Sequence, residues 1–120
     1  MLTKRLTIAI AALAGMLAVL AGAFGAHGFE RSGDMAAAAL FDTASTYQMW
    51  HALALLALAA LGLHASPAAP IFVAAILLFS GSLYAYALTD IGWLVWLTPI
   101  GGLAFIIGWA LFALSAWRTL

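Results

Sequence analysis

The spacing of the charged residues limits what this chain can fold into more than any other feature. Only four basic and four acidic residues occur among 120. They are Lys4, Arg5, Glu30, Arg31, Asp34, Asp42, Asp90 and Arg118. Long uncharged stretches separate them, at residues 6–29, 43–89 and 91–117. Because a helix needs about 20 apolar residues to cross a bilayer, the first and third stretches each predict one membrane helix and the second predicts two.

The composition indicates that lipid is the natural solvent. Hydrophobic residues make up 68% of the chain and charged residues 7%, whereas a soluble domain has about 25% charged residues. A short chain leaves a large share of its surface exposed when it folds, so it could not hide this much apolar surface from water. The sequence therefore predicts an all-α integral membrane protein, with residues 1–120 as a single membrane domain.

The long middle stretch breaks at residues 64–70, where Pro67 and Pro70 would end one helix and begin the next. The expected structure is a four-transmembrane-helix bundle. Its helices are expected at about residues 6–27, 46–64, 70–89 and 93–117.

The basic residues set the expected orientation. Three basic residues, Lys4, Arg5 and Arg118, flank the terminal ends of the first and last spans. The segment 28–45 has only one basic residue, Arg31. The positive-inside rule then places both termini in the cytoplasm. Residues 1–23 also resemble a secretory signal peptide, because a basic pair, an apolar run and small residues follow one another. We interpret this segment as a retained membrane helix.

Between the first and second spans, residues 34–46 are weakly amphipathic and predict a short helix lying at the outer interface. Asp34 follows Gly33 and is a plausible N-cap, since its side chain can accept a hydrogen bond from the first turn. The same residues could instead form an ordered loop, or continue into the second span with a bend.

Small residues at helical spacing predict where the helices pack, because close approach of backbones drives helix association in lipid. The candidate packing residues are Ala14, Ala18, Gly22 and Ala26 in the first span, Gly81 in the third, and Gly101 and Gly108 in the fourth.

Polar side chains near the expected outer ends of the helices form a candidate polar cluster. Because burying a polar group in a membrane is costly, such residues indicate a structural or functional role. Its members are His27, Asp42, Tyr47, Gln48, His51, Asp90 and Thr98. The simpler interpretation is a hydrogen-bonded network that ties helix ends together. A ligand site is the alternative: His27 and His51 could bind a metal such as zinc, bracket a haem or hold a quinone-like head group. A proton path is a third, although few titratable groups lie between His51 and His64.

Other functions find no support in the sequence. The net charge is zero, so no basic patch suggests nucleic acid. The absence of cysteine removes disulfides, thiolate metal sites and thiol catalysis. No serine or threonine has a base and an orienting acid at motif spacing. We therefore expect a protein that is not an enzyme and has no bound cofactor.

Four strings, in order, resemble the DUF423 family of small bacterial inner-membrane proteins, which is similar to transmembrane protein 256 of animal mitochondria. The strings are Gly-Ala-Phe-Gly-Ala-His-Gly at 22–28, Tyr-Gln-Met-Trp-His-Ala-Leu-Ala-Leu-Leu at 47–56, Leu-Phe-Ser-Gly-Ser-Leu-Tyr at 78–84 and Thr-Pro-Ile-Gly-Gly at 98–102, followed by Gly-Trp at 108–109. The resemblance implies a four-helix protein of the bacterial inner membrane but supplies no activity. It also implies that certain residues are motif positions: His27, Tyr47, Gln48, His51, Ser80, Gly81, Ser82, Tyr84, Thr98, Pro99 and Gly101.

Two functions remain open at this point. The first is a scaffold or accessory subunit that docks with a larger membrane complex or with further copies of itself, since the small-residue faces suit helix association. The second is a ligand-binding or transport protein with a metal, haem, lipid or quinone site at His27 and His51.

Overall fold

The structure is a computed structural model that describes residues 1–120. Its elements are all helical. They are α1 (Lys4–Phe24), a π-helical turn (Gly25–Phe29), α2 (Glu30–Ser32), α3 (Met35–Ala60), α4 (Ala68–Thr89), a 3-10 turn (Gly92–Trp96) and α5 (Leu97–Thr119).

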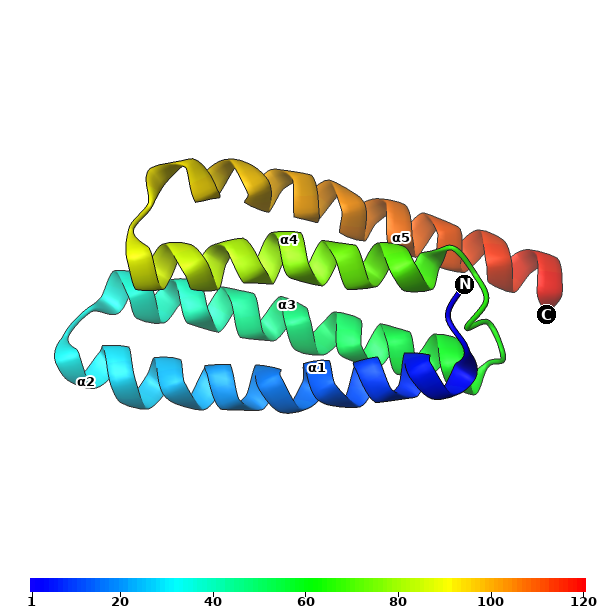
Figure 1. The fold of residues 1–120 in the computed structure, drawn as a ribbon, viewed down its shortest axis with the longest axis horizontal. Coiled ribbons are helices and arrows are strands. Elements are labelled where there is room, and N and C mark those ends of the chain that lie inside the picture. The colour runs from blue at the N-terminus through cyan, green and yellow to red at the C-terminus, as the bar shows by residue number, and fades with distance from the viewer.

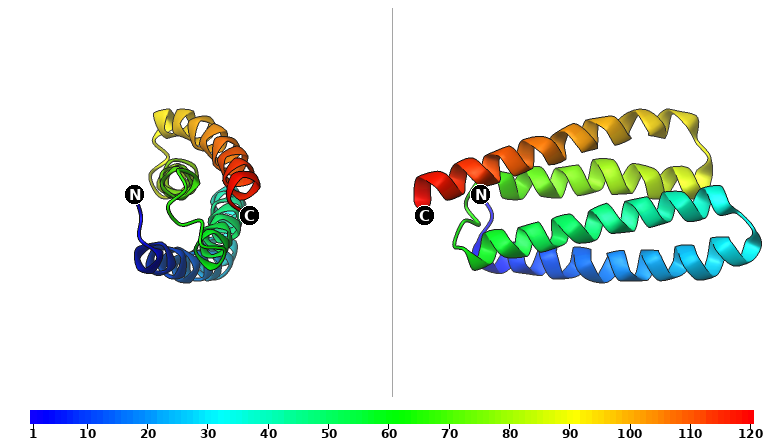
Figure 2. Two further views of the ribbon diagram at one scale, coloured as in Figure 1. Left: turned by 90° about the vertical axis from the view of Figure 1, so that its right-hand side faces the viewer. Right: turned by 180° about the vertical axis from the view of Figure 1, so that it is seen from behind.

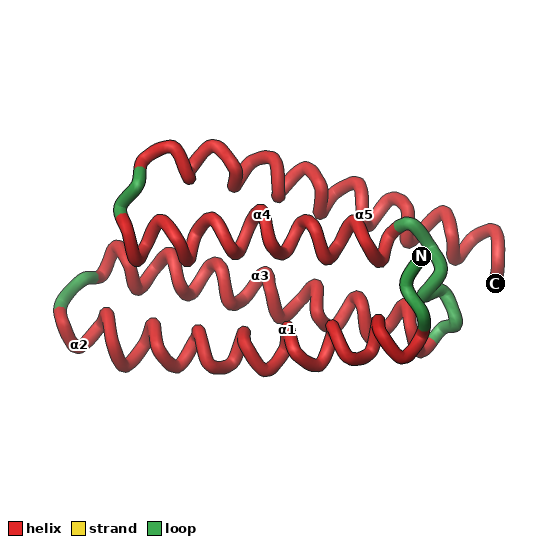
Figure 3. The backbone as a smooth tube through the Cα atoms, viewed as in Figure 1, coloured by secondary structure: helices red, strands yellow, loops and turns green.

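The four long helices lie antiparallel in an elongated bundle of 49 × 25 × 18 Å (Figure 1). Seen along the bundle, they follow a zigzag in which α3 packs between α1 and α4, and α4 packs between α3 and α5 (Figure 2). Both termini lie at one end, together with the loop from α3 to α4, and the other two turns lie at the opposite end (Figure 3). We call these the terminal end and the turn end.

Local chemistry fixes the turn between α2 and α3. Gly33 adopts a left-handed φ of 81°, a conformation that costs a glycine little and ends α2. The Asp34 side chain then accepts a hydrogen bond of 3.1 Å from the backbone nitrogen of Ala37. Asp34 is therefore the N-cap of the next helix, as its sequence position predicts.

The short interfacial helix expected at residues 34–46 is not present as a separate element. Instead α3 runs without interruption from Met35 to Ala60. Its polar residues suggested an interface in the sequence, but Ser45 and Gln48 are buried between helices. The helix also begins well before the expected boundary at residue 46 and ends before the expected boundary at residue 64.

Three helical segments are long and apolar enough to cross a membrane: Lys4–Ser32, Ala68–Thr89 and Gly92–Thr119. Helix α3 is not among them, because polar residues in its first half lower its hydropathy. The fold is thus all-helical, with three candidate spans.

The predicted packing residues divide into three groups. Ala18 is buried, and Ala14 and Gly22 lie half-buried on the side of α1 that faces α3. Gly101 and Gly108 are buried where α5 crosses α4: a Cβ on Gly101 would come 2.7 Å from the Phe79 Cα, and one on Gly108 would come 2.6 Å from the Phe72 ring.

Ala26 and Gly81 do not fit the predicted packing role. Ala26 is exposed, because the π-helical turn packs against α3 through the adjacent Gly25 and turns Ala26 away from it. A Cβ on Gly81 would meet no atom within 4 Å, so this glycine borders open space. The close glycine of the first helix is Gly25, where a Cβ would come 2.8 Å from the Phe41 Cβ.

Candidate functional site

Several polar side chains bond from one helix to another. The Ser80 hydroxyl donates to the Ala44 carbonyl oxygen at 2.7 Å and joins α4 to α3. The hydroxyls of Ser82 and Thr98 lie 2.6 Å apart and join α4 to the start of α5. In lipid no water is present to satisfy such groups, so each bond links two helices instead of leaving a polar atom exposed to hydrocarbon.

Gln48 is the centre of this network. Its Nε2 donates to the Ala14 carbonyl oxygen of α1 at 2.8 Å, and its Oε1 accepts from the Tyr84 hydroxyl of α4 at 2.8 Å. One amide therefore connects three helices, α1, α3 and α4. Such bonds between membrane helices contribute about 0.6 kcal/mol each on average, so their main effect here is to fix helix position.

His51 lies in an aromatic enclosure between α3 and α5. Its ring is 3% exposed and stacks on Phe105, with 3.6 Å between ring centroids. The Trp109 Nε1 donates to His51 Nε2 at 3.1 Å, and the Tyr47 carbonyl oxygen lies 2.6 Å from Nδ1. Because an indole N–H only donates, Nε2 must accept, and Nδ1 carries the proton that it donates to Tyr47. Both ring nitrogens are thus occupied within the protein.

His27 does not lie beside His51, which corrects the common level expected from the sequence. His27 follows Gly25, which packs against Phe41, and so stands near the level of residue 39 on α3. His51 lies about 18 Å further along α3, at a rise of about 1.5 Å per residue. The His27 ring is exposed and has no hydrogen-bond partner within the protein, so a metal or haem held between these two histidines does not fit the structure.

The two carboxylates of the predicted cluster also lie apart from the buried network. Asp42 is exposed on α3, and Asp90 is exposed at the end of α4, in a left-handed conformation with a φ of 57°. No three His, Asp or Glu side chains gather closely enough to hold a metal ion. The predicted cluster therefore separates into buried Gln48 and His51, half-buried Tyr47 and Thr98, and three exposed residues, His27, Asp42 and Asp90.

A groove of about 660 Å³ lies between α1 and α4, and we call it the α1–α4 groove. Its walls run from Ile10 to Phe24 on α1 and from Val73 to Leu88 on α4, and its floor includes Phe41 and Gln48 of α3. Of 15 lining residues, 13 are hydrophobic, so the groove suits an apolar occupant.

Sequence reasoning missed three features of these sites. Trp109 appeared only as part of a motif, and Phe105 carried no signal beyond hydrophobicity, yet the two enclose His51. The groove is visible only in three dimensions. Its one sequence signal was Gly81, which the spacing assigned to packing.

The fold and these contacts define a helical membrane protein in which polar side chains join helices and no catalytic arrangement is evident. The chain belongs to the family described as "Protein of unknown function (DUF423)", whose model matches residues 21–102.

Full-length relatives agree with this assignment. The chain is 39% identical to a UPF0382 membrane protein of Haemophilus influenzae over 120 residues, covering 97% of each chain. It is 40% identical to one of Staphylococcus aureus, covering 95% of this chain and 97% of the relative. It is 34% identical to the UPF0382 inner membrane protein YgdD of Escherichia coli, covering 98% and 93%. No solved structure matches the chain.

Proposed function

We propose that the chain crosses the bacterial inner membrane four times, with both termini in the cytoplasm. Helices α1 and α4 are candidate spans and run in the same direction. The chain leaves α1 at the turn end and enters α4 at the terminal end, and α3 makes that connection (Figure 1). If α1 and α4 cross, α3 must cross between them. The buried polar side chains of α3, Gln48 and His51, are tolerated there because neighbouring helices bond to them.

Charges and indoles support the orientation. Lys4, Arg5 and Arg118 lie at the terminal end, which the positive-inside rule assigns to the cytoplasm. Trp93 and Trp117 lie exposed at opposite ends of the last span, where indoles favour the interface. The inner-membrane name of the Escherichia coli relative supports the same compartment.

Single cysteines test this topology cleanly, because the chain has none of its own. Ser32→Cys lies at the turn end. It should react with a membrane-impermeant maleimide added to cells whose outer membrane has been permeabilised and whose inner membrane is intact. Ala65→Cys, in the loop from α3 to α4, should react only after the inner membrane is broken. Equal labelling of both variants in unbroken membranes would mean that α3 does not cross.

We further propose that the protein acts as a non-enzymatic scaffold or accessory subunit that binds a transmembrane helix of another membrane protein. The observation that carries this proposal is a pair of adjoining shallow hollows on the α1–α3 face, of about 310 and 300 Å³, which share Val19 and Met49. Their lining includes small residues and exposed apolar side chains: Ala12, Gly15, Met16, Ala18, Trp50 and Ala52.

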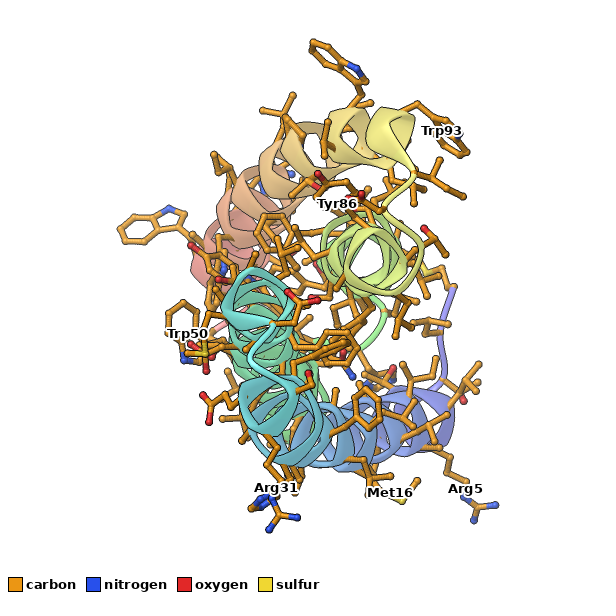
Figure 4. All side chains as sticks on the ribbon, turned by 90° about the vertical axis from the view of Figure 1, so that its left-hand side faces the viewer. Arg5, Met16, Arg31, Trp50, Tyr86 and Trp93 are labelled. Carbon is orange, nitrogen blue, oxygen red and sulfur yellow. The ribbon has the colours of Figure 1, made fainter.

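The chemistry of this face suits a helix as partner. Small residues such as Gly15 and the exposed Ala12 let a second backbone approach, and the half-buried Thr46 can bond across the interface. The unbranched side chains of Met16 and Met49 adapt to an irregular neighbour. Figure 4 shows Met16 and Trp50 pointing outward from α1 and α3.

Gly15→Leu should fill one hollow and weaken partner binding at least tenfold. A Cβ at this position meets only the flexible Met49, at 3.8 Å, so the fold should persist. The matched control is Ala113→Leu, which enlarges an exposed residue of α5. Native mass spectrometry after mild extraction from native membranes measures the partner and its stoichiometry.

Loss of one defined partner in Gly15→Leu, with retention in Ala113→Leu, is the expected result. The proposal would be refuted if the wild-type protein were detected only as a monomer. It would also be refuted if Gly15→Leu retained the partner. A complex composed only of copies of this 12.5 kDa chain would show that the face binds another copy of the protein and not a different protein.

A further inference from the structure

We propose that the α1–α4 groove binds one hydrocarbon chain of a phospholipid that bears an ammonium head group, with the head group at the turn end. The inference goes beyond the scaffold role, because the groove lies between α1 and α4 and not on the α1–α3 face.

The dimensions of the groove fit a single lipid chain. Along α1 it extends from Ile10 to Phe24, which is about 21 Å at a rise of about 1.5 Å per residue. One leaflet of a bilayer supplies about half of a hydrocarbon core about 30 Å thick, so a chain from one leaflet fits within this length.

The polar groups of the floor do not require a polar occupant. Gln48 and Tyr84 bond to each other at 2.8 Å, and Gln48 also bonds to the Ala14 carbonyl oxygen. They therefore present a nearly apolar floor to the groove. The other lining side chains are aliphatic or aromatic apart from Gly81. The middle of the groove therefore favours the methylene groups of a lipid chain over a polar head group.

The two ends of the groove differ, which gives the lipid a direction. At the terminal end the segment 1–3 crosses from α1 toward α4, and Leu2 packs against the core (Figure 2). This segment lies beyond Ile10, the groove residue nearest this end of α1. Toward Phe24 and Leu88 no segment crosses, so a chain can enter there.

Charge at the open end selects the head group. The turn end carries Glu30, Asp34 and Asp90, against one cation, Arg31. Three carboxylates attract an ammonium group and repel a head group with net negative charge. A zwitterionic phosphatidylethanolamine therefore fits better than phosphatidylglycerol.

Gly81 keeps the groove open and supplies the test. A Cβ there would meet no atom within 4 Å, so a large side chain can occupy the groove without moving a helix. Gly81→Phe should fold and displace the lipid, and Gly81→Leu should do so with a smaller side chain. Ala113→Phe is the matched control, since it adds the same ring on an exposed face of α5.

The probe is a vesicle of equal parts phosphatidylethanolamine and phosphatidylglycerol, into which each purified variant is reconstituted. After mild detergent extraction, native mass spectrometry counts the lipids retained per chain. We expect one phosphatidylethanolamine on the wild type and on Ala113→Phe, and at least tenfold less on Gly81→Phe. Thermal unfolding gives a second measurement: added phosphatidylethanolamine should raise the melting temperature of the wild type but not of Gly81→Phe.

Three outcomes would overturn the inference. They are a wild type that retains no lipid, a lipid retained equally by Gly81→Phe, and a preference for phosphatidylglycerol. If protein from native membranes instead carried an isoprenoid or another apolar compound of defined mass, and the vesicle lipid did not bind, the occupant would not be a phospholipid. Partner binding should persist in Gly81→Phe, so the scaffold proposal stands or falls separately.

Discussion

Gly101→Ala should destabilise the protein by about 3 kcal/mol, the upper part of the range for overpacked cores. The added Cβ would overlap the backbone nitrogen of Phe79 and come 2.7 Å from its Cα. Backbone atoms of a helix cannot rotate away as a side chain can, so α4 and α5 would have to separate. Thermal unfolding in mild detergent, followed by tryptophan fluorescence, measures the loss.

Two other glycines of α5, Gly102 and Gly108, serve as comparisons for this prediction. At Gly102 a Cβ would lie 3.8 Å from the Phe79 ring, which is an ordinary contact, so Gly102→Ala should unfold like the wild type. At Gly108 the obstacle is the side chain of Phe72, at 2.6 Å, and a ring can partly adjust. The expected order of stability is Gly102→Ala above Gly108→Ala above Gly101→Ala. Equal stability of Gly101→Ala and Gly102→Ala would show that α4 and α5 are further apart than the structure has them.

His51→Ala should also cost about 3 kcal/mol, whereas His27→Ala should cost almost nothing. His51 is 3% exposed, so its removal leaves a cavity against Phe105 and takes the acceptor from the Trp109 N–H. His27 is exposed and unbonded, so its removal breaks no contact of this kind.

The same unfolding assay measures this contrast, and metal analysis of both variants accompanies it. Metal content should be the same in His27→Ala, His51→Ala and the wild type. If the two substitutions had equal effects on stability, or if both removed the same bound metal, the two rings would act together and the separation described above would be wrong.

The sequence was sufficient for the class of fold, because charge spacing and helix length act independently of tertiary contacts. It also located Asp34 as a cap and placed the end of α4 at Thr89, where Asp90 leaves the helix. These signals are local: a side chain bonds to its own turn, or a charge stops an apolar run.

The candidate site was harder to predict because polarity in a sequence does not say which way a side chain faces. The charged and polar residues of the segment 34–46 suggested the interface, and the second span was therefore expected to begin at residue 46. The helix begins at Met35, where Asp34 caps it, and Gln48 bonds to the neighbouring helices α1 and α4. This earlier start moves His51 from the end of the bundle toward its middle, which separates it from His27.

Glycine posed a similar difficulty. Gly81 and Gly101 occur in comparable apolar contexts, yet one borders a groove and the other admits a backbone at close range. Only the positions of the neighbouring helices distinguish the two, and no local pattern in the sequence encodes those positions.

The zigzag order of the helices has a consequence for biogenesis. The most extensive interfaces join α1 with α3 and α4 with α5, so each helix finds its main partner immediately before or after it along the chain. Chains dominated by such local contacts fold quickly, since little loop entropy is lost before contacts form. The two helical hairpins can therefore assemble one after the other as the ribosome releases them, and the earlier hairpin does not need to wait for the C-terminus.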